Sequence, residues 1–234
     1  MLNIVKLTVV YPDNTKAVDK FTLHAGKEES VALAGENGAG KTTLMLAITG
    51  VLPIAEGSVQ VDGITLEKKN LNDIRARTGL VFQNPDDQLF TASVYDDIAF
   101  GPRNYGLPEK QVAERVNQTL EELGITRLLG RSALKLSGGE KRLAAIAAVL
   151  SMNPSVLLFD EPTAFLDLKA RRNLIRLLNK MPQTKLIASH DLLFLEEVCG
   201  RAVLMKNGTV FTEGAPADLF HDKKLMEDCG LEAI

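Results

Sequence analysis

Tryptophan, cysteine and histidine are scarce in this sequence, which has none, two and three of them among 234 residues. The two cysteines, Cys199 and Cys229, have no His or Cys beside them at metal-ligand spacing. Neither a disulfide scaffold nor a zinc site fits this pattern, so we expect free or buried thiols. The sequence also lacks an excess of positive charge, because its net charge is −3. We therefore expect no nucleic-acid partner.

Long apolar runs are missing as well. The longest, such as residues 144–150 and 156–159, fall well short of the roughly 18 to 20 residues that a membrane span requires. The first residues, MLNIVKLTVVYPD, lack the basic, apolar and small-residue zones of a signal peptide. We expect a chain that stays in the cytoplasm and does not cross a membrane. Hydrophobic residues at 45% and charged residues at 24% are typical of globular proteins.

Short β-branched runs alternate with helical segments along the chain, at residues 30–34, 79–82, 156–159, 186–189 and 202–205. This alternation predicts an α/β fold with a largely parallel sheet that is covered on both faces. Turn signals at residues 12–14, 56–57 and 62–63 predict a small antiparallel sheet beside it. Asn207 and Gly208, between two apolar runs, predict a tight hairpin.

The pattern becomes helical between about residues 84 and 152. Apolar residues at 112, 116, 120 and 123 lie on one face of a helix that Pro108 and Glu109 open. This block interrupts the strands, so we interpret it as an inserted helical subdomain. The predicted organisation is one domain, with a core and its β subdomain at residues 1–83 and 153–234 and a helical subdomain at about 84–152.

A glycine-rich turn follows the first predicted buried strand. Its sequence, GENGAGKTT, matches the phosphate-binding pattern G-x-x-x-x-G-K-[ST] and lies between a strand and a helix, as that pattern requires. Backbone N–H groups of such a turn point at phosphate oxygens, and the helix N-terminus adds positive potential. We expect Lys41 to contact the β- and γ-phosphates of a nucleoside triphosphate and Thr42 to hold Mg²⁺. The predicted phosphate site comprises Gly35, Glu36, Asn37, Gly38, Ala39, Gly40, Lys41, Thr42 and Thr43.

Two adjacent carboxylates, Asp160 and Glu161, end the apolar run at residues 156–159. Charges are costly inside a strand, so they belong at its carboxyl end, where parallel sheets bind their ligands. We expect Asp160 to orient Mg²⁺ through its water shell. Glu161 is the predicted general base that takes a proton from an attacking water.

The sequence LSGGE at residues 136–140 opens another apolar helix. One interpretation is a capping box, with Ser137 three residues before Glu140. The other is a second anion site, because two glycines in a first turn lower helix propensity and leave the backbone N–H groups bare. This site would consist of Ser137, Gly138 and Gly139. The motif alone leaves both interpretations open.

Taken in order, these motifs closely resemble the ATP-binding-cassette ATPases over nearly the whole chain. The resemblance includes GENGAGKT, Gln83 after LVF, LSGGE, LLFDE, TAFLD at residues 163–167 and His190 after LIAS. It implies a RecA-like P-loop NTPase core and the cofactors ATP and Mg²⁺. It also implies that two such subunits face each other head to tail, so that each ATP lies between the phosphate loop of one and the LSGGE motif of the other.

The resemblance assigns roles to individual residues. Gln83 would contact Mg²⁺ and the attacking water, and His190 the γ-phosphate. Asp167 would lie at the dimer interface. Tyr11 matches the aromatic residue that stacks on adenine. Two positions depart from the common pattern, because Glu140 stands where many relatives carry glutamine and Phe165 where a small residue is common.

Residues 82–104, FQNPDDQLFTASVYDDIAFGPRN, are similar to the energy-coupling-factor branch, whose ATPases drive the uptake of vitamins or of cobalt and nickel. By this analogy, the segment from Asn84 to Phe90, with Gln88, lines a groove for a helix of an integral membrane partner. We expect an ATP-hydrolysing importer subunit at the cytoplasmic face of the cell membrane. Its second ATPase subunit is another copy or a related chain.

Three other functions share part of this pattern. A small-molecule kinase has a phosphate loop and a sheet but no use for LSGGE. A cassette protein of DNA repair or of the ribosome usually carries coiled-coil or tandem-domain insertions, which are missing here. The third is an ATPase of another transporter class, which the sequence does not distinguish from an importer ATPase of the energy-coupling type.

Overall fold

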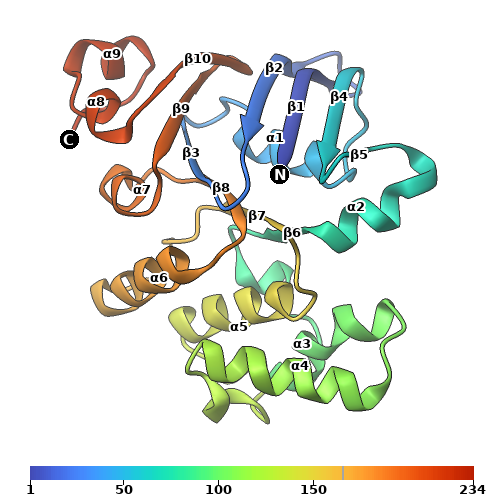
Figure 1. Ribbon diagram of the computed structural model, residues 1–234. Helices are drawn as coiled ribbons and strands as arrows, with labels where there is room; N and C mark the ends of the chain where they lie inside the picture. The colour runs from blue at the N-terminus through green and yellow to red at the C-terminus, as the bar shows by residue number, and fades with distance from the viewer. Residues whose placement is uncertain (165) are drawn as a thin grey trace.

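The computed structural model describes residues 1–164 and 166–234 and contains a six-stranded sheet in the order β10-β9-β3-β8-β7-β6 (Figure 1). Strands β3, β6, β7, β8 and β9 run parallel, and β10 pairs antiparallel with β9. Their bounds are β3 Ser30–Ala34, β6 Thr78–Val81, β7 Val156–Asp160, β8 Thr184–Ala188, β9 Arg201–Lys206 and β10 Thr209–Gly214. All five predicted strands are therefore present, with ends displaced by at most two residues, and Asn207–Gly208 forms the predicted hairpin turn.

A second, antiparallel sheet has the order β2-β1-β4-β5. It consists of β1 Leu2–Val10, β2 Lys16–Ala25, β4 Glu56–Val61 and β5 Ile64–Thr65. The prediction of a small sheet from the first sixty-odd residues is confirmed, but the turn predicted at Glu56–Gly57 is wrong. Gly57 lies inside β4 with a φ of 86°, where a Cβ would come within 2.3 Å of the Lys6 carbonyl oxygen. Glycine marks an irregular strand pairing at this position.

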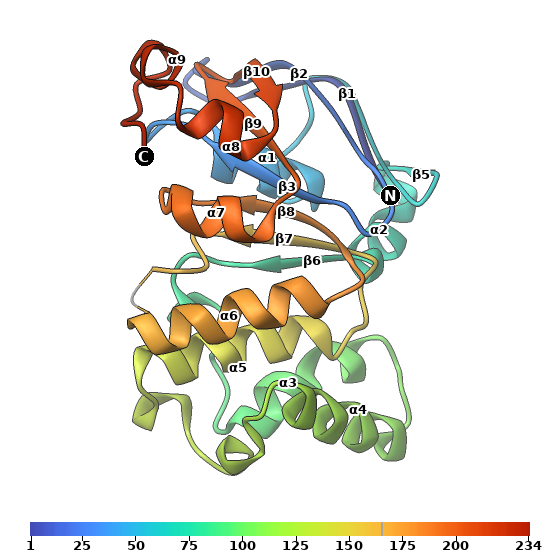
Figure 2. The ribbon, with the colours of Figure 1, turned by 60° about the vertical axis from the view of Figure 1, so that its left-hand side comes forward.

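Helix α1, Lys41–Ile48, is buried between the two sheets and forms a layer between them (Figure 1). Its apolar side chains pack against both sheets in one cluster of buried residues. The other face of the main sheet is covered by α6 Leu168–Lys180, α7 Leu192–Val198, α8 Pro216–Phe220 and α9 Lys223–Asp228 (Figure 2). A parallel sheet that is buried on both faces explains why its strands are mostly apolar.

The segment between β6 and β7 is helical, with α3 Val94–Asn104, α4 Glu109–Glu122 and α5 Gly138–Leu150 around a third apolar cluster. The predicted face of α4 is confirmed, because Val112, Val116 and Leu120 are buried. Helix α5 contributes side chains to this cluster and to the cluster under the main sheet. Helix α2, Leu71–Arg77, precedes β6. No described helix is long and apolar enough to span a membrane.

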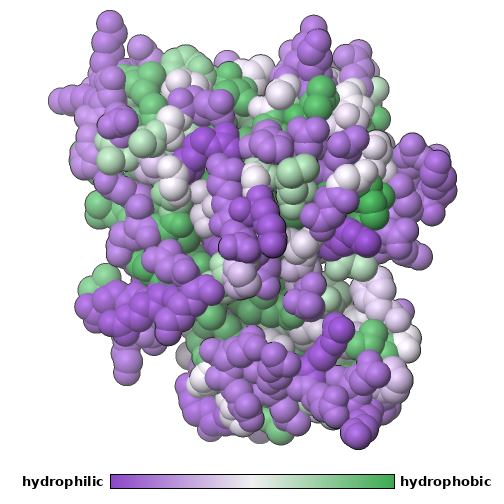
Figure 3. All heavy atoms as spheres, in the orientation of Figure 1, coloured by the Kyte–Doolittle hydropathy of each residue, from purple (hydrophilic) through white to green (hydrophobic). Residues whose placement is uncertain are grey.

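Short 3₁₀ turns complete the structure, at Lys68–Asn70, Pro85–Asp87, Thr126–Leu128 and Ala133–Lys135. The predicted thiols Cys199 and Cys229 are both free and buried. The prediction for Phe165 lies outside the described residues. The face shown in Figure 3 is mostly hydrophilic, with several hydrophobic patches that lie over the sheets as well as next to the helical segment.

Candidate functional site

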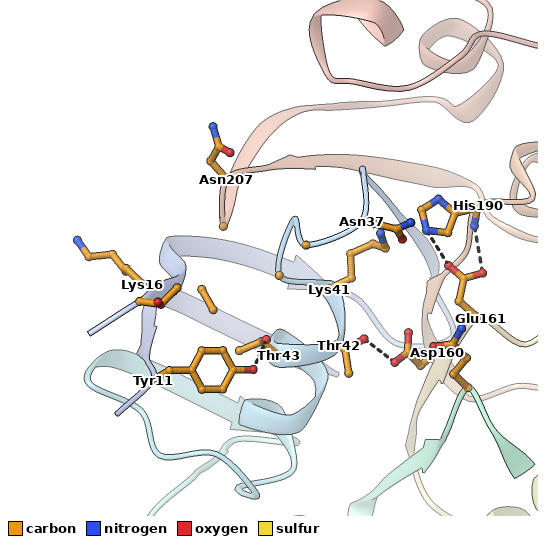
Figure 4. Close-up of a pocket in the computed structure, with 16 residues that line it drawn as sticks. Tyr11, Lys16, Asn37, Lys41, Thr42, Thr43, Asp160, Glu161, His190 and Asn207 are labelled. Carbon is orange, nitrogen blue, oxygen red and sulfur yellow. Dashed lines mark hydrogen bonds and ion pairs between the residues drawn. The ribbon is translucent and has the colours of Figure 1, made fainter. Parts of the chain in front are cut away.

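A cavity of about 550 Å³ lies where α1 begins, next to the carboxyl ends of β6, β7 and β8. Eleven of the predicted site residues line it: Tyr11, Asn37, Gly38, Gly40, Lys41, Thr42, Thr43, Gln83, Asp160, Glu161 and His190. Figure 4 shows Tyr11 and Thr43 on one side, Asp160, Glu161 and His190 on the other, and Lys41 and Thr42 between them. Residues that are up to 179 positions apart in sequence therefore meet at one cavity.

The loop between β3 and α1 needs glycine at two positions. Gly40 has a φ of 102°, and a Cβ there would lie 2.3 Å from the Ala17 carbonyl oxygen. A Cβ on Gly35 would lie 2.3 Å from the Met205 carbonyl oxygen. At these two positions the loop passes too close to β2 and β9 to carry a side chain. Gly40, Lys41 and Thr42, at the start of α1, line the cavity, and a helix N-terminus favours an anion there.

The Lys41 side chain is held inside the loop. Its Nζ donates to the carbonyl oxygens of Gly35 at 2.7 Å and Glu36 at 3.0 Å. Burial lowers the pKa of Lys41 from its usual value, and the nearby carboxylates of Glu161 and Asp160 oppose this change. Gly35, Glu36 and Ala39 belong to the predicted loop but do not line the cavity. Gly35 and Glu36 contribute the backbone acceptors that hold Lys41.

Two hydroxyl contacts join the loop to other elements. Thr42 Oγ1 donates to Asp160 Oδ2 at 2.7 Å, which links α1 to the end of β7. Tyr11 Oη and Thr43 Oγ1 are hydrogen-bonded at 2.8 Å, which fixes the tyrosine ring at the cavity wall. A hydroxyl and a carboxylate side by side are the oxygen donors that Mg²⁺ prefers.

Glu161 is held in an unusual backbone conformation, with a φ of 47°. Its N–H donates to the Ala188 carbonyl oxygen at 2.9 Å, and its Oε2 accepts from Ser189 Oγ and from the His190 N–H, each at 3.2 Å. Among the described residues, its buried Oε1 has no hydrogen-bond partner, although His190 Nε2 lies 3.4 Å away. A carboxylate oxygen left without a donor beside a polar cavity is suited to accept a proton from water.

The LSGGE motif lies away from this cavity. Ser137 is the N-cap of α5 and forms the capping box, with Ser137 Oγ 3.3 Å from the Glu140 nitrogen and Glu140 Oε2 3.0 Å from the Ser137 nitrogen. Both backbone N–H groups donate. Ser137 and Gly138 are exposed, and Gly139 is partly exposed. The capping-box interpretation is confirmed, and it leaves the exposed N-terminus free to face another molecule.

Glu140, the departure from the common pattern, also pairs with Arg127. The bonds from Arg127 and from the Ser137 N–H lower the pKa of Glu140 to about 2. Asp167 is the exposed N-cap of α6, where its Oδ1 accepts from the Ala170 N–H at 2.7 Å.

Sequence reasoning missed several residues. Thr15, Lys16, Ala17, Asn207 and Gly208 also line the cavity. The sequence at Asn207–Gly208 predicts the hairpin turn but not its position at the cavity, because that position depends on the long-range pairing of β3 with β9. Gly208 N–H donates to the Ala39 carbonyl oxygen at 3.0 Å, so this turn supports the phosphate loop directly. Arg142, in the middle of an apolar helix, was also missed.

A protein-family model described as ABC transporter matches residues 18–164, more than half of the chain. The chain belongs to this family. The chain is also 40% identical over 236 residues to the energy-coupling factor transporter ATP-binding protein EcfA of Methanothermobacter thermautotrophicus. That alignment covers 99% of the chain and 76% of the relative.

Two solved ABC structures have the same fold. CbiO1 of Clostridium perfringens, described as part of the ABC transporter complex CbiONQ, is 36% identical with a TM-score of 0.86. This match covers 97% of the chain and 93% of CbiO1. A dimeric post-hydrolysis state of the ATP-binding cassette MJ0796, bound to ADP and Pi, is 25% identical with a TM-score of 0.83 and coverage of 92% and 99%. The α/β P-loop NTPase fold and the assignment as an ABC ATPase, predicted from the motifs, are both confirmed.

Proposed function

We propose that this ABC ATPase is the energy-coupling subunit of an importer and binds MgATP in the cavity lined by Lys41 and Glu161. The observation that carries the proposal is the meeting of the glycine-rich loop with the carboxylates at the end of β7 around one cavity. The similarity to EcfA and CbiO1 supports the energy-coupling branch. Cobalt, nickel or a vitamin is the proposed cargo, and its recognition belongs to another subunit.

Phosphate binding begins at the loop. The N–H groups from Gly38 to Thr43 would hold the phosphate oxygens, and the Lys41 amine would leave its two carbonyl acceptors for the β- and γ-phosphates. Thr42 and Asp160, with Gln83, are the residues that would hold Mg²⁺. The ion would balance charge on the phosphates. Tyr11 would stack on the adenine ring.

Glu161 is the proposed general base. Its Oε1 is buried and forms no hydrogen bond among the described residues, with His190 Nε2 3.4 Å away, while Oε2 accepts two hydrogen bonds. This arrangement would direct Oε1 at a water that attacks the γ-phosphate. Gln83, which follows the neighbouring strand β6, would also hold that water, and His190 would contact the γ-phosphate. A positioned general base typically contributes about 10²–10⁴-fold to a rate.

A second ATPase subunit would complete the site. The α5 N-terminus with Ser137, Gly138 and Gly139 is exposed and would face the ATP of the partner subunit. Leu134 and Leu168, beside LSGGE and Asp167, are 89% and 77% exposed. The partner subunit would cover both side chains. The dimeric MJ0796 structure supports such a pairing.

Membrane subunits would bind at a second cavity of about 740 Å³ between α2, α3 and the end of α5. Gln88 and Phe90 of the predicted segment line it, together with Arg75, Phe100 and Tyr105. The aromatic side chains of Phe90, Phe100 and Tyr105 are 63%, 45% and 42% exposed. We place this groove at the junction of the proposed core, residues 1–83 and 153–234, with the helical subdomain. It would hold the ATPase at the cytoplasmic face of the membrane.

Replacing Phe90 with aspartate tests this groove. A carboxylate in place of this aromatic ring is expected to abolish co-purification with membrane subunits, because the partner helix would lose an apolar contact and would have to cover a charged group. Basal ATP hydrolysis of the isolated chain should stay within about twofold, since Phe90 lies outside the nucleotide cavity. Phe211→Asp on β10, at a site that is 41% exposed, is the matched control and should leave membrane association intact. Equal association of both variants would contradict the assignment of the groove.

Replacing Tyr11 with alanine tests the adenine side of the cavity. Stacking of a base on an aromatic ring is worth about 1–3 kcal/mol, so the Kd for ATP should rise by about 5- to 160-fold. Tyr11→Phe keeps the ring and loses only its bond to Thr43, and should weaken binding less. Calorimetric titration with ATP measures the Kd of both variants. Unchanged affinity of the alanine variant would exclude stacking.

The proposed function is tested by purifying the tagged chain from detergent-treated membranes of its own cells and identifying the integral proteins bound to it. We expect integral subunits of an importer that take up cobalt, nickel or a vitamin into vesicles when MgATP is supplied. Recovery of an exporter, or of no integral membrane protein, would contradict the proposal. The assignment as an ABC ATPase would stand in either case.

A further inference from the structure

Arg142 is the largest of the completely buried side chains and is only 1% exposed. It lies on α5, four residues after Gly138 and so about one helical turn from the exposed N-terminus. Arginine is rarely buried unless it is paired. The partners of this guanidinium are not carboxylates but backbone carbonyl groups.

Three carbonyl oxygens accept from Arg142. Its Nη1 donates to Phe82, and its Nη2 donates to Gln83 and, at 3.4 Å, to Glu161. The first two lie just after β6 and the third just after β7. One rigid guanidinium therefore bridges the two loops that carry Gln83 and Glu161. Its planar fork fixes both distance and direction, which a lysine ammonium does not do.

The cost of burying this group indicates that it serves more than stability. Burial lowers the pKa of Arg142, and the charges of Asp160 and Glu161 oppose this effect and favour the charged form. Among the described residues its Nε has no hydrogen-bond partner. A buried charge with incomplete bonding is seldom more stabilising than an apolar side chain of similar size. The two loops that it joins are those on which the proposed hydrolysis depends.

We propose that Arg142 is a positioning residue for ATP hydrolysis, which sets the backbones of Gln83 and Glu161 beside the γ-phosphate and ties both to α5. This inference rests on the proposed roles of Gln83 and Glu161. Arg142 does not line the nucleotide cavity. It acts through the carbonyl groups, and a shift of either loop moves the helix that begins with Ser137, Gly138 and Gly139.

Arg142→Lys is the first test, because lysine keeps the charge but cannot bridge three carbonyl groups in one plane. Misplacement of catalytic groups by about 1 Å costs about 10²-fold, so we expect kcat to fall by about 10- to 100-fold. The KM and the Kd for ATP should stay within about threefold, because the phosphate loop is untouched. Arg115→Lys is the matched control: its Nη1 donates to one carbonyl, that of Ser151, at 3.2 Å, and we expect normal kcat.

A kcat of Arg142→Lys within threefold of the unchanged protein would overturn the inference. Loss of ATP affinity together with kcat would overturn it too, since the residue would then support the whole site. Arg142→Met gives a further comparison, but the lysine variant decides the question even if methionine prevents folding.

A double-mutant cycle with Gln83→Ala distinguishes positioning from general support. If Arg142 acts through the Gln83 loop, Arg142→Lys should reduce kcat much less in the Gln83→Ala background than alone. Additive losses would contradict the inference. If Gln83→Ala and Glu161→Gln both hydrolyse ATP at the normal rate, the proposed site itself is rejected. If these two variants lose turnover while Arg142→Lys keeps it, only the role of Arg142 is rejected.

Discussion

Replacing Glu161 with glutamine is expected to lower kcat for ATP hydrolysis by about 10²–10⁴-fold, the typical contribution of a general base. Glutamine has the same shape, and its amide oxygen can still accept from Ser189 and the His190 N–H. The variant should therefore bind ATP normally but fail to take a proton from water. Phosphate release measures kcat, and titration with a fluorescent ATP analogue measures affinity.

The Glu161→Gln variant should also accumulate as an ATP-bound dimer, which gives a second measurement. Because ATP would persist between two subunits, the mass measured by light scattering should rise from 25.5 kDa to about twice that value with MgATP. Glu196→Gln is the matched control, because Glu196 Oε2 also lies 3.4 Å from a histidine nitrogen, that of His221, but outside the cavity. Normal hydrolysis by Glu161→Gln would show that another group is the base.

Replacing Lys41 with methionine is expected to raise the Kd for ATP by at least about 10-fold. The amine would make charge-assisted bonds to phosphate, each worth about 1.5–3 kcal/mol, and methionine fills a similar volume without the charge. The binding of adenosine, which has no phosphates, should change little. Calorimetric titration with both ligands measures the difference.

Lys185→Met controls for the loss of a buried amine. Lys185 is 2% exposed, and its Nζ donates to the carbonyl oxygens of Met181 at 2.7 Å and Gln183 at 2.9 Å, much as Lys41 does inside its loop. It lies at the opposite end of β8 from His190. This variant should lose stability but bind ATP normally. Equal ATP affinity of both methionine variants would contradict the phosphate role of Lys41.

The sequence predicted the parts of the fold that depend on local patterns. The parallel strands are apolar because both faces are buried, and the loop from Gly35 to Thr43 needs glycine where β2 and β9 approach it. The start of β8 was placed two residues late, because a lysine at position 185 is atypical of a buried strand. Its amine is satisfied by two carbonyl groups, which no local pattern reveals.

The residues that the sequence did not predict depend on contacts between distant segments. Asn207 and Gly208 reach the nucleotide cavity only because β9 pairs with β3. Arg142 lies among the alanines and leucines of α5, where a charged side chain is usually assigned to the solvent-exposed face. Its carbonyl partners lie 19 to 60 residues away, and backbone acceptors leave no signature in a sequence.

A crystal structure of the Glu161→Gln variant with MgATP tests the central claim most directly. The account predicts the γ-phosphate beside Lys41, Mg²⁺ next to Thr42 and Asp160, and the exposed α5 N-terminus of a second subunit against the same phosphate. Nucleotide bound outside the cavity, or a second chain that presents a different surface to the phosphate, would contradict it.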